Sequence, residues 1–245
     1  LAVEAMEASG ELRLDGRDGV PRTAELPACL WPLAGLGYCG SLQSLALCQL
    51  GLAALHPAAS ALASLVSLDV SGNALATLPD ALGQLGALQR IDASHNHMTA
   101  CPACVWALPS LRWLSLRHNA LGSLFSLPML PACAASLEEI DLGHNLLPSL
   151  PEAIGGLFAL RALDLSHNRL QMVPSQVLAL QTKSLRMLDL AHNAQPSSVL
   201  LLDCHIAAGC YVAVEFCTAP RPSASLKGDS ARYVAMFAQV ARLVS

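Results

Sequence analysis

The chain has 245 residues, a formal net charge of −4 at pH 7, and a composition that is 53% hydrophobic and 13% charged. The negative charge excludes the basic surface that nucleic-acid binding needs, so DNA and RNA are not expected as main partners. No run of about 18 uninterrupted apolar residues is present, and the first residues lack the basic and apolar regions of a signal peptide. Neither a membrane span nor a signal peptide is therefore predicted.

The first part of the chain, residues 1–25, is predicted to be a cap or a degenerate repeat. It contains Leu12-Arg13-Leu14, which is a candidate first strand. A second short strand is expected at Leu45-Ala46-Leu47, where Leu50 takes a position that asparagine fills in the units that follow. Without the asparagine side chain, a backbone group of the turn loses its usual partner, so a distorted unit is expected here.

A regular repeat governs the middle of the chain. Six asparagines recur at intervals of 23, 23, 26, 23 and 25 residues, each after a short strand motif: Asn73, Asn96, Asn119, Asn145, Asn168 and Asn193. The alternating leucines of each strand are expected in the core, and the asparagines are expected to form a ladder that bonds to turn backbone. A return arm, Leu-Pro-x-x-Leu-x-x-Leu, follows at residues 78–85 and is matched by residues 26–33. Proline lacks an N–H, so loop and short helix are expected there.

These features resemble the leucine-rich-repeat family, in its intracellular 23-residue form with Leu-Pro return arms, over residues 26–193. The resemblance implies an α/β solenoid: a right-handed, curved superhelix of seven or eight repeats with a parallel sheet on its concave side. It also implies a role in protein recognition. Secreted members usually close their ends with disulfide-linked cysteine clusters, whereas the nine cysteines here are scattered. An intracellular, cytoplasmic protein with reduced thiols is therefore expected.

The repeat pattern stops after Asn193, and residues 194–245 are expected to form a capping segment. It contains two strand-like runs, a linker and a final helix, at residues 199–202, 210–216, 219–225 and 230–244. Asp229 or Ser230 is suited to cap that helix. The helix is expected to pack over the open end of the solenoid; the alternative is that it docks on a partner.

Two other patterns are candidate sites of chemistry. Cys101 and Cys104 have the spacing of a redox pair, but they align with core positions of a return arm, so they are predicted to be small core residues. Five histidines precede the asparagines and form a column: His95, His118, His144, His167 and His192. Collinear imidazoles do not surround an ion tetrahedrally, so no metal is expected, although mutual repulsion predicts sensitivity to pH below about 6.5. Because the polar positions recur in every unit, no catalytic residues, cofactor or small-molecule substrate are expected.

The positions between the core leucines face outward on the concave sheet and are the expected contact surface. Nine are predicted to contact a protein partner: Arg90, Asp92, Trp113, Arg117, Glu139, Asp141, Asp164, Met187 and Asp189. The family pattern alone explains the column of aspartates. In the middle unit Trp113, Ser115 and Arg117 interrupt that column, and an outward tryptophan flanked by arginine is a composition enriched at binding hot spots. Trp113 and Arg117 are therefore the predicted anchors, with the acidic column guiding a basic segment.

Three functions are compatible with these observations. The first is a non-catalytic module that binds a protein partner through its concave face. The second is a structural subunit of a large assembly, because charged residues are about half as frequent as in a typical soluble domain; a strong alanine bias would also explain this composition. The third is the regulatory part of a longer signalling enzyme.

Overall fold

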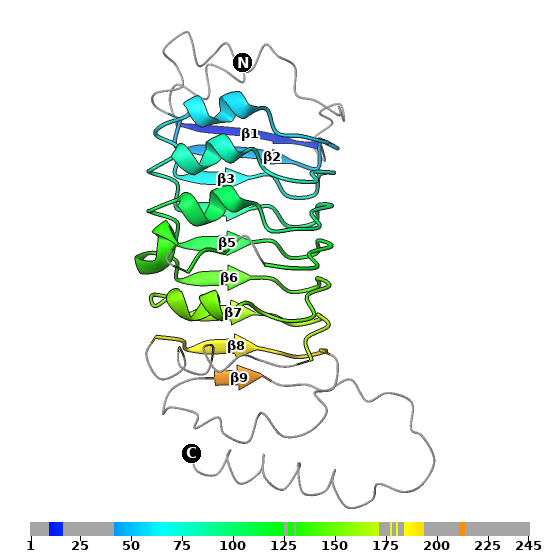
Figure 1. Cartoon of the computed structure of the whole chain (residues 1–245). Helices are drawn as coiled ribbons and strands as arrows, with labels where there is room; N and C mark the ends of the chain where they lie inside the picture. The colour runs from blue at the N-terminus through cyan, green and yellow to red at the C-terminus, as the bar shows by residue number, and fades with distance from the viewer. Residues whose placement is uncertain are drawn as a thin grey trace, which may run out of the picture.

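A computed structural model of the chain describes residues 10–16, 42–124, 127–129, 131–171, 177, 180, 184–193 and 211–213, the last of these by their backbone only. Its centre is one nine-stranded sheet in which parallel strands follow one another in chain order (Figure 1). The strands are β1 (Glu11–Asp15), β2 (Ser44–Cys48), β3 (Ser67–Asp69), β4 (Arg90–Asp92), β5 (Trp113–Ser115), β6 (Glu139–Asp141), β7 (Ala162–Asp164), β8 (Met187–Asp189) and β9 (Tyr211–Ala213). Each predicted unit thus contributes one strand.

The register of the sheet is constant from strand to strand. Leu12 lies opposite Leu45, which lies opposite Leu68, so the expected strands at Leu12 and Leu45 are confirmed. The same leucine or isoleucine position pairs at every step to β8. At the far end, Met187 lies opposite Tyr211, so part of the strand-like run at 210–216 extends the sheet as β9.

The return arms form short 3-10 helices. They are η5 (Pro57–Ala61), η6 (Asp80–Gln84), η7 (Ala103–Ala107), η8 (Ala132–Ala135) and η9 (Glu152–Gly156). A proline in an extended conformation precedes each of the last four, with φ between −61° and −71°. Because proline fixes φ near this value and cannot donate to a ladder, it ends the extended chain and starts the helix. The expected short helices are thus confirmed, and in the described arms they are 3-10 helices.

The core is a continuous layer of leucines between the sheet and the return arms. The strand residues Leu68 and Leu114 and the arm residue Leu82 are each no more than 1% exposed. Fully burying such a side chain contributes about 1.5–3 kcal/mol. A single unit has too few leucines to enclose them, so each unit depends on its neighbours for this burial.

The asparagine ladder is present as expected. Asn96 shows its pattern: Nδ2 donates to the Val70 carbonyl of the preceding unit at 3.0 Å and to the Ala93 carbonyl of its own unit at 3.1 Å. Its Oδ1 accepts from the Leu75 amide at 3.0 Å. Asn73, Asn119, Asn145, Asn168 and Asn193 repeat this arrangement. Each asparagine therefore joins two successive turns.

The distortion expected at Leu50 is not found. Leu50 is 1% exposed, and its amide donates to Asn73 Oδ1 of the next unit at 3.0 Å. Gln49 before it has a φ of 56°, within the 52–57° range of the five column histidines at the equivalent position. Its amide donates to the Ser71 carbonyl, the same turn-to-turn bond that later units make. The expectation was wrong because the following unit supplies a partner for this turn.

Several sequence expectations fall outside the described residues. They are the match at residues 26–33, the strand-like run at 199–202, the linker at 219–225 and the final helix at 230–244. The boundaries at residues 25 and 193 therefore remain predictions. Within the described part of the chain, no helix is long and apolar enough to cross a membrane.

Candidate protein-binding face

The strand register brings all nine predicted contact residues to one side of the sheet, called the sheet face below. In β3 to β8 its first row contains Ser67, Arg90, Trp113, Glu139, Ala162 and Met187. The middle row contains Asp69, Asp92, Ser115, Asp141, Asp164 and Asp189. Arg117 lies two residues after the end of β5, and its side chain reaches the aspartates of the middle row. Met187, at 46% exposed, is the most accessible large apolar side chain of the six strands.

The aspartates of the middle row have a structural role. In each unit, Oδ1 accepts a hydrogen bond of 2.8–3.0 Å from the amide two residues later, as Asp92 does from Ser94. Asp69, Asp92, Asp141, Asp164 and Asp189 all make this bond. The carboxylate fixes the start of the turn that carries the asparagine, which gives a local reason for its recurrence. One oxygen of each carboxylate is thus committed to the fold.

Arg117 does not extend freely into solvent. Its Nη1 lies 2.9 Å from Asp164 Oδ2 and 3.5 Å from Asp141 Oδ1, so one guanidinium bridges two units of the acidic column. Gly143 makes room for it, because a Cβ there would lie 2.6 Å from Arg117 Nη1. Burial raises the pKa of the Asp141 carboxyl, while the Gly143 amide and Arg117 act to lower it. Arg117 therefore offsets part of the negative charge at the centre of the column.

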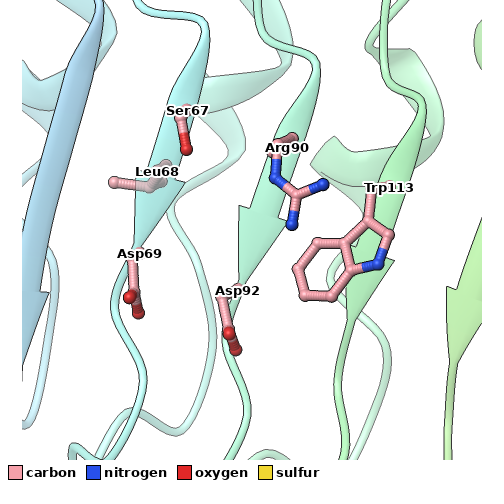
Figure 2. Close-up of a pocket in the computed structure, with 6 residues that line it drawn as sticks. All are labelled: Ser67, Leu68, Asp69, Arg90, Asp92 and Trp113. Atoms are coloured by element: carbon pink, nitrogen blue, oxygen red, sulfur yellow. The ribbon is translucent and has the colours of Figure 1, made fainter.

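Trp113 pairs with a different arginine. The Arg90 guanidinium carbon lies 4.3 Å from the centre of the Trp113 ring, within the range of a cation–π contact. Beside this pair is a hollow of about 100 Å³, lined by Ser67, Leu68, Asp69, Arg90, Asp92 and Trp113. Figure 2 shows Asp69 and Asp92 on neighbouring strands, with the Arg90 side chain above Asp92 and the Trp113 ring to its right. The regular face is therefore hollowed next to its one partly exposed aromatic residue among β3 to β8.

The histidine column is a stack of imidazole rings along the turn that follows the strands. Neighbouring ring centres are 3.9–4.2 Å apart and the planes differ by 12–20°. Burial first, and then the charges of neighbouring histidines and Arg117, lower the pKa of His118 and His144 below the ordinary 6.5. The fold thus favours the neutral imidazoles of His118 and His144. Among the described residues, no group of three or more His, Cys, Asp or Glu side chains is arranged to hold a metal ion.

The described part of the chain contains four cysteines, all of them buried: Cys48, Cys101, Cys104 and Cys133. Cys101 and Cys104 are each 4% exposed in the core around η7, which confirms that they are small core residues. Burial raises the pKa of the Cys104 thiol to about 11. Such a thiol is protonated at neutral pH and is a poor nucleophile.

Sequence reasoning missed three features of the face. It placed Trp113 beside both Arg90 and Arg117 without deciding between them, and Arg90 contacts the ring. It did not foresee that Arg117 reaches across two units, although the glycine at position 143, where other units carry a side chain, was an available signal. It also treated Ser115 as an outward contact residue, but this side chain is 3% exposed.

Comparison with known proteins agrees with this architecture. A leucine-rich-repeat family model matches residues 40–98 and 134–170. No curated protein sequence matches the chain. A leucine-rich-repeat protein of Leptospira interrogans is similar in structure, with 27% identity and a TM-score of 0.64 over 79% of this chain and 52% of that one.

A second similar structure is the leucine-rich-repeat ectodomain of the plant membrane receptor kinase GASSHO1/SCHENGEN3 from Arabidopsis thaliana, in complex with CASPARIAN STRIP INTEGRITY FACTOR 2. It is 26% identical, with a TM-score of 0.56 over 78% of this chain and 22% of that one. The chain thus spans about half the length of the first protein and about a fifth of the second.

One parallel strand per unit, a buried leucine layer and an asparagine ladder define a repeat solenoid with one face of its sheet uncovered by its own return arms. The matching family model and both similar structures are of the leucine-rich-repeat kind. The described part of the chain is therefore a leucine-rich-repeat solenoid.

Proposed function

We propose that this chain is a non-catalytic interaction module that binds a protein partner through its sheet face. The observation that carries the proposal is the Arg90–Trp113 pair beside a hollow, on a face whose other units repeat a regular pattern. A partly exposed aromatic ring next to arginine is the kind of group that dominates interface energetics. Trp113 is the proposed anchor, while Arg117, held by Asp141 and Asp164, keeps the neighbouring carboxylates in place.

Two further observations support this assignment. The similar Arabidopsis ectodomain was solved in complex with another molecule, so a leucine-rich-repeat solenoid of this kind can act as a receptor for one. The asparagine spacing and the arm at residues 78–85 favour the intracellular 23-residue type, and the buried thiols of Cys48, Cys104 and Cys133 are in keeping with a reducing compartment. An intracellular location is part of the proposal.

One observation favours the second function, a scaffold subunit that uses its outer surface. Phe158 is 55% exposed next to η9, and Met129 is 70% exposed. The Met129 carbonyl lies 2.7 Å from where a Cβ of Gly156 would be, so the two segments are adjacent. Exposed apolar groups outside the sheet face are suited to a contact within an assembly.

A paired affinity purification with mass spectrometry distinguishes the two functions. Wild-type protein, Trp113→Ala and Phe158→Ala are compared for the partners they retain, and circular dichroism checks that all three are folded. Under the proposal, Trp113→Ala weakens the partner's affinity by roughly 2 kcal/mol or more, while Phe158→Ala changes it by less than about 0.5 kcal/mol. The reverse pattern would assign the contact to the outer surface instead.

A further inference from the structure

Negative charge is concentrated on the sheet face. Between β3 and β8 this face has six carboxylates and two arginines: Asp69, Asp92, Glu139, Asp141, Asp164 and Asp189 against Arg90 and Arg117. Over the same span, the described residues outside the face have three carboxylates and four arginines: Asp80, Glu138 and Glu152 against Arg112, Arg161, Arg169 and Arg186. The excess negative charge therefore belongs to one surface of the solenoid.

Two carboxylates in the amino-terminal half of this face are not held in an ion pair. Arg117 bridges Asp141 and Asp164, whereas Asp69 and Asp92 make no ion pair within the described part of the chain. Both carboxylates use Oδ1 for the turn amides of Ser71 and Ser94, which holds them in fixed positions. Both carboxylates line the hollow, and together with the one guanidinium of Arg90 in the same lining they leave it a net charge of −1.

The shape of the hollow suits a small planar or compact cation. Its volume of about 100 Å³ has room for the head group of an arginine or a lysine. The Trp113 ring forms the aromatic wall of the hollow. The Arg90 guanidinium carbon, 4.3 Å from the centre of this ring, already makes a cation–π contact with it. A second cation between Asp69 and Asp92 would pair with both carboxylates and lie near this ring (Figure 2).

We propose, building on the function proposed above, that the occupant of the sheet face is a basic, extended segment of a partner protein, with one arginine or lysine head group in the hollow between Asp69 and Asp92. The charge of the face is complementary to such a segment. The same charge repels nucleic acid and anionic lipid, which leaves a basic polypeptide as the occupant.

Synthetic peptides test this inference directly. A fluorescent 12-residue peptide with four arginines and a matched peptide with four glutamates are titrated with the full chain, at low and at physiological salt. The arginine peptide is expected to bind, with an affinity that falls as salt rises, and the glutamate peptide is not. Equal binding of both peptides, or of neither, would overturn the inference.

Two double variants with the same charge change locate the site. Asp69→Asn/Asp92→Asn keeps the Oδ1 acceptors that the turns need, and it is expected to weaken arginine-peptide binding at least tenfold. Asp80→Asn/Glu152→Gln removes two outer carboxylates and should alter it less than twofold. Equal losses in the two variants would mean that only overall charge attracts the peptide.

The outcomes separate this inference from the proposed function. If the arginine peptide fails to bind, yet partner capture still depends on Trp113, the sheet face binds a partner that is not basic. In that case the proposed function stands and the basic segment is refuted. If partner capture is insensitive to Trp113→Ala while the arginine peptide binds at Asp69 and Asp92, the anchor is refuted and the cation site stands.

Discussion

Replacement of Asn145 by alanine tests the asparagine ladder. Asn145 is 4% exposed; its Nδ2 donates to the Leu116 and Leu142 carbonyls at 2.9 and 3.0 Å, and its Oδ1 accepts from the Leu121 amide at 3.0 Å. Alanine removes all three bonds. The Leu116 and Leu142 carbonyls still accept from Asn119 and Asn168, whereas the Leu121 amide loses its acceptor. One buried amide without a partner costs about 1–3 kcal/mol and each of the two other lost bonds about 0.5–1.5 kcal/mol, so the expected loss is about 2–6 kcal/mol.

That loss is large beside the total stability of a typical domain, about 5–15 kcal/mol. The measurement is urea unfolding followed by circular dichroism and by tryptophan fluorescence, because Trp113 lies in the unit directly before that of Asn145, and Trp106 lies in the return arm before Trp113. Ser149→Ala, an exposed change in the same unit, is the control and should stay within about 0.5 kcal/mol. A loss below about 1 kcal/mol for Asn145→Ala would refute the reasoning, since it would mean that the freed backbone groups find other partners.

Three further predictions follow from the site. First, because the pKa values of His118 and His144 are lowered in the fold, the unfolded chain takes up protons first, so the free energy of unfolding should fall as pH drops through about 6.5 and level off only below the folded pKa values. The free energy of unfolding, measured from pH 8 to 5, should depend less on pH when all five column histidines are replaced by glutamine. Glutamine suits this turn position, because Gln49 occupies it with a φ in the same range. An unchanged dependence on pH would contradict this prediction. Second, Gly143→Ala should displace Arg117 and cost about 1 kcal/mol, and much less in an Arg117→Ala background; equal costs in a double-mutant cycle would show that the two positions do not interact. Third, the raised pKa of Cys104, about 11, and its burial predict that iodoacetamide labels the tryptic peptide containing Cys104 at least tenfold more slowly in native than in urea-unfolded protein, and similar rates would show an accessible thiol.

The sequence alone determined the architecture of the solenoid. The alternation of leucines assigned the inward face of each strand, and the spacing of the asparagines assigned the turns, because both depend on local periodicity that repeats many times. The strands at Leu12 and Leu45, the proline-initiated return arms and the core positions of Cys101 and Cys104 follow from the same alignment. The column of histidines was also visible, since residues at equivalent positions of parallel strands must lie side by side.

Only the tertiary structure decided which side chains on the sheet face contact one another. Sequence register places residues in rows, but a long arginine can reach any of several neighbours, and its choice depends on local space and charge. Arg117 turns toward Asp141 and Asp164 because Gly143 leaves room there, and Arg90 takes the Trp113 ring. The turn at Leu50 likewise depends on a partner in the next unit. These are contacts between units, and they are decided by the three-dimensional stacking of side chains whose conformations no repeat pattern specifies.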